Sequence, residues 1–187
     1  MEQYREQYCR LRDEIIARQF GNLNPVQRDA VFTLRGPVLI LAGAGSGKTT
    51  VVVNRIANMI LYGEAYGSSY VPEGLTQQDL DFLAHCDVRD SANTAALSQL
   101  LGYHRVRPWN ILAITFTNKA ANELKERLER TLGPDALDIN AGTFHSACVR
   151  MLRRDIACMG YPQSFTIYDT DDSVRVIKDA LKTLGID

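Results

Sequence analysis

A segment rich in glycine, with one lysine and two hydroxyl side chains, follows an apolar run in the first third of the sequence. It reads AGAGSGKT and runs from Ala42 to Thr49. Closely spaced glycines let the backbone wrap around an anion with its N–H groups pointing inward, and a lysine ammonium adds positive charge to such a cup. A helix that begins within the segment would contribute its dipole and its unpaired N–H groups. The segment therefore predicts a site for phosphate groups.

The same segment fits the P-loop of nucleoside triphosphate-binding proteins, although alanine stands at its first position instead of glycine. On this interpretation Lys48 contacts the β- and γ-phosphates and the Thr49 hydroxyl binds Mg²⁺, which makes these two the candidate catalytic residues. The other candidate nucleotide-binding residues in the loop are Ala42, Gly43, Ala44, Gly45, Ser46, Gly47 and Thr50. The alternative is a glycine-rich turn with a solvated lysine, which the flanking elements disfavour.

These flanking elements are a strand before the loop and a helix after it. The run GPVLILA, residues 36–42, is apolar throughout and bounded by turn residues, which is typical of a strand buried on both faces. A helix is expected to begin inside GSGKTT and to continue through Ile60. Ahead of the strand, Asn24 is a good N-cap, Pro25 suits the first helical position, and Gln27 stands where a capping box closes.

The segment 62–107 has a different composition, rich in glycine, serine and tyrosine near its start. We interpret it as an insertion with two short helices, near Thr76–Cys86 and Ser91–Leu101, because structureless loops of that length are uncommon. Further strands are expected at Ile111–Thr115, within LDINAGTF, and as a candidate at FTIYD, residues 165–169. Helices with apolar stripes are expected between and after them. The alternation predicts an α/β fold with a parallel sheet flanked by helices.

Composition excludes some classes of protein. The 187 residues carry a net charge of -1, so a nucleic-acid-binding surface would have to be local. The four cysteines form no C-x-x-C pair and show no metal-ligand spacing with the histidines, which favours reduced thiols in a cytoplasmic protein. No apolar run approaches the roughly 18 residues of a membrane span. We expect no membrane partner.

Four segments occur together in a recognisable order: LNPVQRDAV, AGAGSGKT, ILAITFTNKAANELKERL and AGTFHSACVRMLRR. In this the chain resembles the UvrD/Rep-type superfamily 1 DNA helicases over nearly all of its length except the insertion. The resemblance implies a P-loop NTPase fold of the RecA-like type, here incomplete, with ATP and Mg²⁺ as cofactors. It also implies single-stranded DNA and the remaining helicase domains as partners. The full-length protein would then be an ATP-dependent DNA helicase that translocates on one strand and unwinds duplex.

The resemblance assigns a role at the adenine to Gln27, which from the residues alone is a capping residue. Thr50 stands where much of the family has an arginine against the adenine, so stacking from that side is in doubt. Arg55, further along the same helix, would either substitute for that arginine or be solvated.

Two further segments resemble motifs that contact single-stranded DNA. In TFTNKAA, an aromatic ring at Phe116 would follow a strand at its carboxyl end and could stack on a base of any identity. The other candidate DNA-binding residues are Thr115, Thr117, Asn118, Lys119, Thr143 and His145. From the residues alone, Phe116 would be a core aromatic and His145 a core histidine on an apolar stripe.

A motor of this class also needs an Asp-Glu pair at the end of a buried strand, to hold magnesium and orient the attacking water. The best candidate, Asp169 in FTIYDTDD, lacks the glutamate, so we interpret it as a helix-capping acid. The chain is expected to be the front portion of a helicase that alone binds ATP weakly and does not hydrolyse it. The expected divisions are 1–61 with the P-loop, 62–107 as the insertion, 108–160 with the DNA-contacting motifs, and 161–187 as the start of an inserted helical subdomain.

Three alternatives stay open at this stage. The whole protein could be a helicase–nuclease, since such proteins share this front end. The chain could instead be a small P-loop kinase or nucleotide-binding regulator, although no acidic metal partner or acceptor site is visible. It could also be a non-catalytic module whose segment 62–107 recruits a partner.

Overall fold

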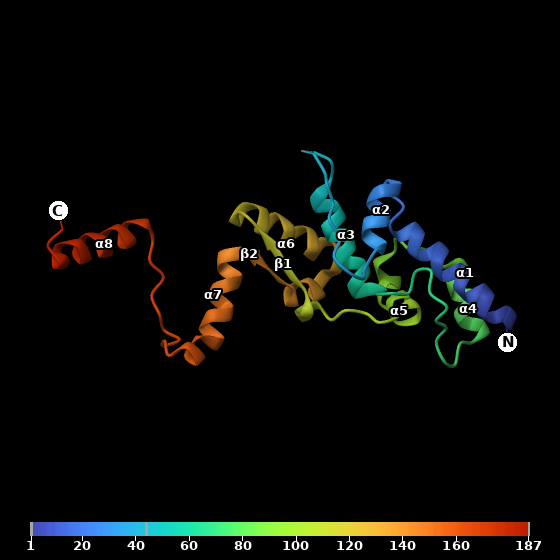
Figure 1. The fold of residues 1–187 in the computed structure, drawn as a ribbon. Helices are drawn as coiled ribbons and strands as arrows, with labels where there is room; N and C mark the ends of the chain where they lie inside the picture. The colour runs from blue at the N-terminus through green and yellow to red at the C-terminus, as the bar shows by residue number, and fades with distance from the viewer. Residues whose placement is uncertain (1, 44, 187) are drawn as a thin grey trace. The chain divides into compact units, whose positions relative to one another are not determined.

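The computed structural model describes residues 2–43 and 45–186, which divide into a first compact unit ending at Thr143 and a second beginning at Phe144 (Figure 1). The first unit contains α1 (Glu2–Gln19), α2 (Pro25–Phe32), α3 (Lys48–Leu61), α4 (Gln77–His85), α5 (Ser91–Leu101), β1 (Leu112–Thr115), α6 (Asn118–Leu132) and β2 (Asn140–Thr143). The second contains α7 (Phe144–Asp155) and α8 (Thr170–Leu184). Short 3₁₀ turns at Pro108–Asn110, Gly133–Asp138 and Ile156–Met159 complete the description.

The sheet of the first unit consists of β1 and β2, which pair in parallel with Leu112 opposite Asn140 and Thr115 opposite Thr143. Helix α6 connects them. Both strands were predicted, but β1 is buried on one face only. Ala113 packs with α3 and α6 in one hydrophobic core, whereas Leu112 and Ile114 on the opposite face are each 46% exposed. The mixed α/β class is confirmed.

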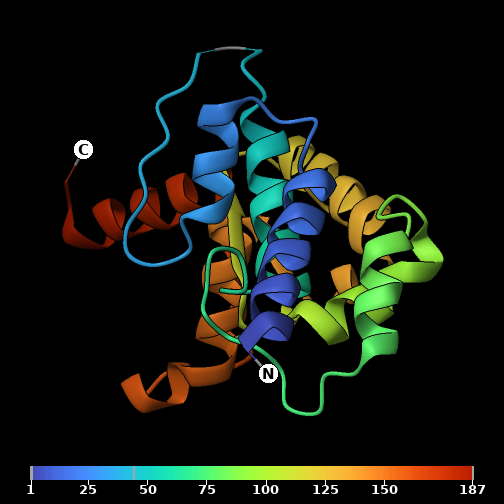
Figure 2. The ribbon, with the colours of Figure 1, turned by 90° about the vertical axis from the view of Figure 1, so that its right-hand side faces the viewer.

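A second core in the first unit unites α1 with the two helices of segment 62–107 (Figure 2). Leu80 and Leu83 of α4 and Leu97 of α5 are buried together with Tyr8 and Ile15 of α1. The two predicted helices are therefore confirmed, at Gln77–His85 and Ser91–Leu101. Both helices therefore belong to the folded core. They cover one face of α1 that would otherwise be exposed to water.

A fully buried arginine joins the same two regions. The Arg12 guanidinium donates hydrogen bonds to the Ser68 carbonyl at 2.6 Å and the Tyr70 carbonyl at 2.9 Å, and lies 2.9 Å from the Asp13 carboxylate. The Tyr8 hydroxyl donates to the Leu100 carbonyl at 2.9 Å. These partners lie between 56 and 92 residues away in the sequence, apart from Asp13, so the segment is fixed to α1 by hydrogen bonds as well as by apolar contacts.

Two predicted strands do not form. Residues 36–42 run as an irregular segment in the long connection between α2 and α3, and they pair with no strand of the described residues (Figure 2). Residues 165–169 are likewise irregular, with Ile167 and Tyr168 more than half exposed. Val26 on α2 is likewise an exposed apolar side chain, at 77%. An apolar run becomes a buried strand only if neighbouring strands satisfy its backbone on both sides, and here they do not.

In the second unit, Ala147 is the only buried side chain among the described residues. Asp169 caps α8 by accepting from the Asp172 N–H at 2.8 Å, which confirms its predicted capping role. The apolar stripe of α8 is present but exposed: Val174, Ile177, Leu181 and Leu184. Across the described part of the chain, none of the helices combines the length and apolar character that crossing a bilayer requires.

Candidate nucleotide-binding site and strand-end surface

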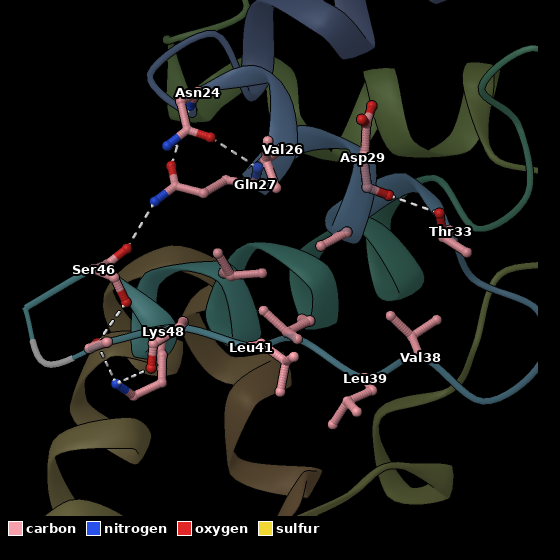
Figure 3. Close-up of a pocket in the computed structure, with 15 residues that line it drawn as sticks. Asn24, Val26, Gln27, Asp29, Thr33, Val38, Leu39, Leu41, Ser46 and Lys48 are labelled. Atoms are coloured by element: carbon pink, nitrogen blue, oxygen red, sulfur yellow. Dashed lines mark hydrogen bonds between the residues drawn. The ribbon is translucent and has the colours of Figure 1, made fainter.

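The start of α2 is joined to the glycine loop by Gln27 (Figure 3). Asn24 and Gln27 form the predicted capping box: the Asn24 side chain accepts from the Gln27 N–H at 2.9 Å, and the Gln27 Oε1 accepts from the Asn24 N–H at 3.1 Å. The Gln27 Nε2 then donates to the Ser46 carbonyl at 3.1 Å. Since a glutamine amide has two N–H groups and two lone pairs, Gln27 retains one of each for a further partner.

Two glycines give the loop its shape. Gly45 and Gly47 have φ angles of +73° and +82°, in the left-handed region that side-chain-bearing residues rarely adopt. A Cβ at Gly47 would also lie 3.0 Å from the Gln27 Nε2. Within the loop, the Ser46 hydroxyl donates to the Gly43 carbonyl at 2.7 Å. Ala44, a predicted site residue, lies outside the described residues.

Lys48 is the first residue of α3, and its side chain folds back over the loop (Figure 3). Its Nζ donates to the Gly43 carbonyl at 2.6 Å and the Ala42 carbonyl at 3.1 Å. The ammonium is therefore held at the loop instead of extending into solvent.

The N-terminus of α3 also has no side-chain cap. In contrast, α2, α4, α5, α6 and α8 each begin with a side chain that accepts a backbone N–H. The first N–H groups of α3 can thus meet an anion, which the helix dipole favours.

The remaining predicted residues of α3 lie in different surroundings. Thr49 and Thr50 are half-buried in the first turn. Arg55 is half-buried and donates to the Ala30 carbonyl of α2, and burial lowers the pKa of its guanidinium. Arg55 is therefore not simply solvated, and in this structure its guanidinium links α3 to α2.

A cavity of about 510 Å³ lies between α2, the irregular segment 38–43 and the start of α3. Its volume falls within the range of small-molecule sites. Gln27, Ser46 and Lys48 supply polar atoms to its wall (Figure 3). The apolar part of the wall comes largely from Val38, Leu39, Ile40 and Leu41, the residues predicted to form a buried strand. Leu39 and Leu41 are 83% and 87% exposed, so this wall is open to solvent.

The carboxyl ends of β1 and β2 form a separate polar edge. Thr115 and Thr143 are opposite each other in the last register position of the two strands. The next residue, Phe116, is 97% exposed, so the interpretation of this ring as a core aromatic is wrong. Thr117 caps α6 by accepting from the Ala120 N–H at 3.2 Å. Asn118 and Lys119 follow in the first turn of α6 and are exposed.

His145 belongs to the second unit, in the first turn of α7, and is exposed. Its ring lies edge-on to Phe144, with the ring centroids 6.0 Å apart. The interpretation as a core histidine is therefore wrong.

Sequence reasoning missed two parts of the nucleotide-site candidate. The Gln27–Ser46 hydrogen bond joins residues 19 positions apart, and no local pattern indicates it. Residues 38–41, predicted as part of a buried strand from an apolar run between turn residues, form a wall of the cavity instead. In the described ranges, no group of three or more His, Cys, Asp or Glu side chains is placed to hold a metal ion.

One protein family and several known proteins are similar in sequence to this chain. The family described as UvrD/REP helicase N-terminal domain matches residues 23–69 and 94–187. The ATP-dependent DNA helicase PcrA of Bacillus subtilis (strain 168) is 45% identical over 167 residues, which are 89% of this chain and 17% of that helicase. PcrA of Staphylococcus aureus (strain NCTC 8325 / PS 47) is 41% identical over 167 residues, with the same shares. The chain thus spans 17% of the length of these relatives.

Proposed function

The chain belongs to the family of UvrD/REP helicase N-terminal domains, and from this premise we propose that it is the ATP-binding front portion of an ATP-dependent DNA helicase. The relatives at 41–45% identity are named as helicases of that kind. In the full-length protein, ATP hydrolysis would drive movement along single-stranded DNA, because closing motor domains around ATP changes their grip on the strand.

The observation that carries the proposal is the uncapped N-terminus of α3. This helix begins at Lys48, and the loop before it is joined to α2 by the hydrogen bond from Gln27 to Ser46. This arrangement offers a triphosphate several backbone N–H groups, a helix dipole and one ammonium. The ammonium now contacts two carbonyls, and a phosphate oxygen would replace them with a charge-assisted hydrogen bond.

The cavity beside the loop supports a place for the base and sugar. Gln27 borders it and retains one N–H and one lone pair, which match the donor and acceptor on the edge of adenine. Thr49 is the candidate Mg²⁺ contact within this chain. Because magnesium takes few protein ligands together with substrate phosphates, the Thr49 hydroxyl would hold the ion alongside the phosphate oxygens. Bound magnesium would neutralise charge that develops on the phosphates.

The strand-end edge supports the DNA role. An aromatic ring as exposed as Phe116 costs free energy in water and is suited to stacking on a base. Thr115, Asn118 and Lys119 would contact phosphate oxygens beside it. Thr143 and His145 are proposed as contacts from the following segment.

We propose the domain divisions 1–61, 62–107, 108–160 and 161–187 as functional segments of the helicase. The family match leaves out residues 70–93, within the proposed insertion. The sequence lacks an Asp-Glu pair after a buried strand, so the isolated chain would bind ATP weakly without hydrolysing it.

The experiment is a titration of the chain with a fluorescent ATP analogue, with and without Mg²⁺. Lys48→Ala removes a charged hydrogen-bond donor worth about 1.5–3 kcal/mol, so affinity should fall about 10- to 150-fold. Lys125→Ala, an exposed lysine on α6, is the matched control and should bind normally. Gln27→Ala should reduce the ratio of the affinity for ATP to the affinity for GTP. Equal affinity in the Lys48 variant and the unsubstituted chain would refute the proposal, and brisk phosphate release with single-stranded DNA would refute the claim of no hydrolysis.

A further inference from the structure

A second cavity in the first unit, of about 810 Å³, is lined by arginines. Arg18 comes from the end of α1, Arg28 from α2, Arg89 from the connection between α4 and α5, and Arg130 from α6. No aspartate or glutamate is among the lining residues. In a chain with a net charge of -1, four guanidinium groups around one hollow form a local positive site.

Three of these four arginines take part in no ion pair among the described residues. Elsewhere in the described chain, arginines such as Arg35 and Arg127 lie against carboxylates at 2.6 Å. Among the ion pairs of the described residues, none involves Arg18, Arg28 or Arg89. Arg130 is paired only at the surface, 3.3 Å from Glu126, with its side chain 76% exposed. The cavity thus brings together three arginines without an ion pair, Arg18, Arg28 and Arg89, and a fourth, Arg130, that is paired at the surface.

One of the lining arginines also has an unsatisfied donor. The Arg28 Nε is buried and has no hydrogen-bond partner. Leaving a buried donor unpaired is costly, more so when it is charged. Neutral donors line the same hollow, among them Asn54 and Thr94.

We propose that this cavity binds phosphates of a DNA backbone, at a contact separate from the strand-end edge of β1 and β2. Guanidinium groups match phosphate geometry, and hydroxyl and amide donors commonly accompany them in phosphate contacts. Arginines from four separate elements suit a chain of phosphates better than a single ion. The naming of DNA as the polyanion rests on the proposed helicase function. Arg89 lies within residues 62–107, so the proposed insertion supplies part of the wall of this site.

The test measures the affinity of the chain for labelled DNA by fluorescence anisotropy between 50 and 200 mM salt. The test variant is Arg18→Gln/Arg28→Gln/Arg89→Gln. The control is Arg10→Gln/Arg127→Gln/Arg175→Gln, which makes the same change in charge at arginines already paired with carboxylates. Three lost phosphate contacts lower the salt slope by about 2.7 on duplex or about 2.1 on single-stranded DNA. On duplex, the affinity of the unsubstituted chain should fall about 40-fold more across this range than that of the test variant.

The control variant should keep the slope of the unsubstituted chain. A change confined to duplex or to single-stranded DNA identifies which backbone the site takes. If the test variant unfolds by circular dichroism, Arg89→Gln alone, at an exposed position, should lower the slope by about 0.9 on duplex. An unchanged slope in the test variant overturns the inference, as does displacement of DNA by polyglutamate at equal charge. Failure of the unsubstituted chain to bind any DNA would instead count against the proposed function.

Discussion

Replacing Phe116 with alanine should weaken single-stranded DNA binding and leave the fold unchanged. The ring is 97% exposed, so its removal creates no cavity and loses almost no packing. Exposed substitutions of this kind shift the free energy of unfolding by no more than about 0.5 kcal/mol. A stacked base, however, is worth about 1–3 kcal/mol per aromatic ring. The expected loss of affinity for single-stranded DNA is therefore about 5- to 150-fold.

Fluorescence anisotropy with a labelled oligothymidine at fixed salt measures this loss. Tyr161→Ala is the matched control, since Tyr161 is an aromatic residue that is 61% exposed and is not among the proposed DNA contacts. Phe116→Trp should preserve binding, because the larger ring still stacks. The reasoning is refuted if Phe116→Ala binds as tightly as the unsubstituted chain, or if its loss of affinity matches that of the tyrosine control.

Three further predictions concern stability. Asn24→Ala removes the capping box of α2 and should cost about 1 kcal/mol, seen as a drop of about 2–4 °C in Tm; an unchanged Tm would argue against the cap. Leu83→Ala should cost about 2–5 kcal/mol in urea unfolding because its side chain is fully buried, whereas Leu137→Ala, 74% exposed, should cost little; similar costs would contradict the core assignment of α4. Hydrogen bonding to Arg35 lowers the pKa of Glu64 from 4.5 to about 2, so its contribution to stability is present above pH 4.5 and lost as the pH falls toward 2. Acid titrations of Tm should be flatter for Glu64→Gln over that window, and identical profiles would disprove the link.

Local patterns in the sequence predicted local structure well. The capping box of α2 lies within four residues, Asn24 to Gln27, and it forms in the structure as predicted. The two helices of segment 62–107 begin at a threonine cap and an aspartate cap, which are equally local features. The strands at Ile111–Thr115 and within LDINAGTF were also predicted, and they form the parallel pair Leu112–Thr115 and Asn140–Thr143.

Features that depend on distant partners could not be predicted. Arg12 looks like a solvated arginine on α1, yet it is fully buried because carbonyls at Ser68 and Tyr70 receive its N–H groups. The run 36–42 has the composition of a strand but not the neighbours, so it stays irregular. Phe116 was judged a core aromatic from its residue type alone, and only the position of the strand end shows that it faces solvent.

The most direct test of the central claim is hydrogen–deuterium exchange of the backbone amides with and without ATP and Mg²⁺. If the glycine loop and the uncapped start of α3 hold the phosphates, peptides covering residues 43–50 should exchange more slowly when ATP is added. The peptide containing Gln27 should be protected as well, and Lys48→Ala should reduce both effects when ATP is present at the concentration that half-saturates the unsubstituted chain. Unchanged exchange at 43–50 under saturating ATP, or equal protection in Lys48→Ala at the half-saturating concentration, would contradict the assignment of this loop as the nucleotide site.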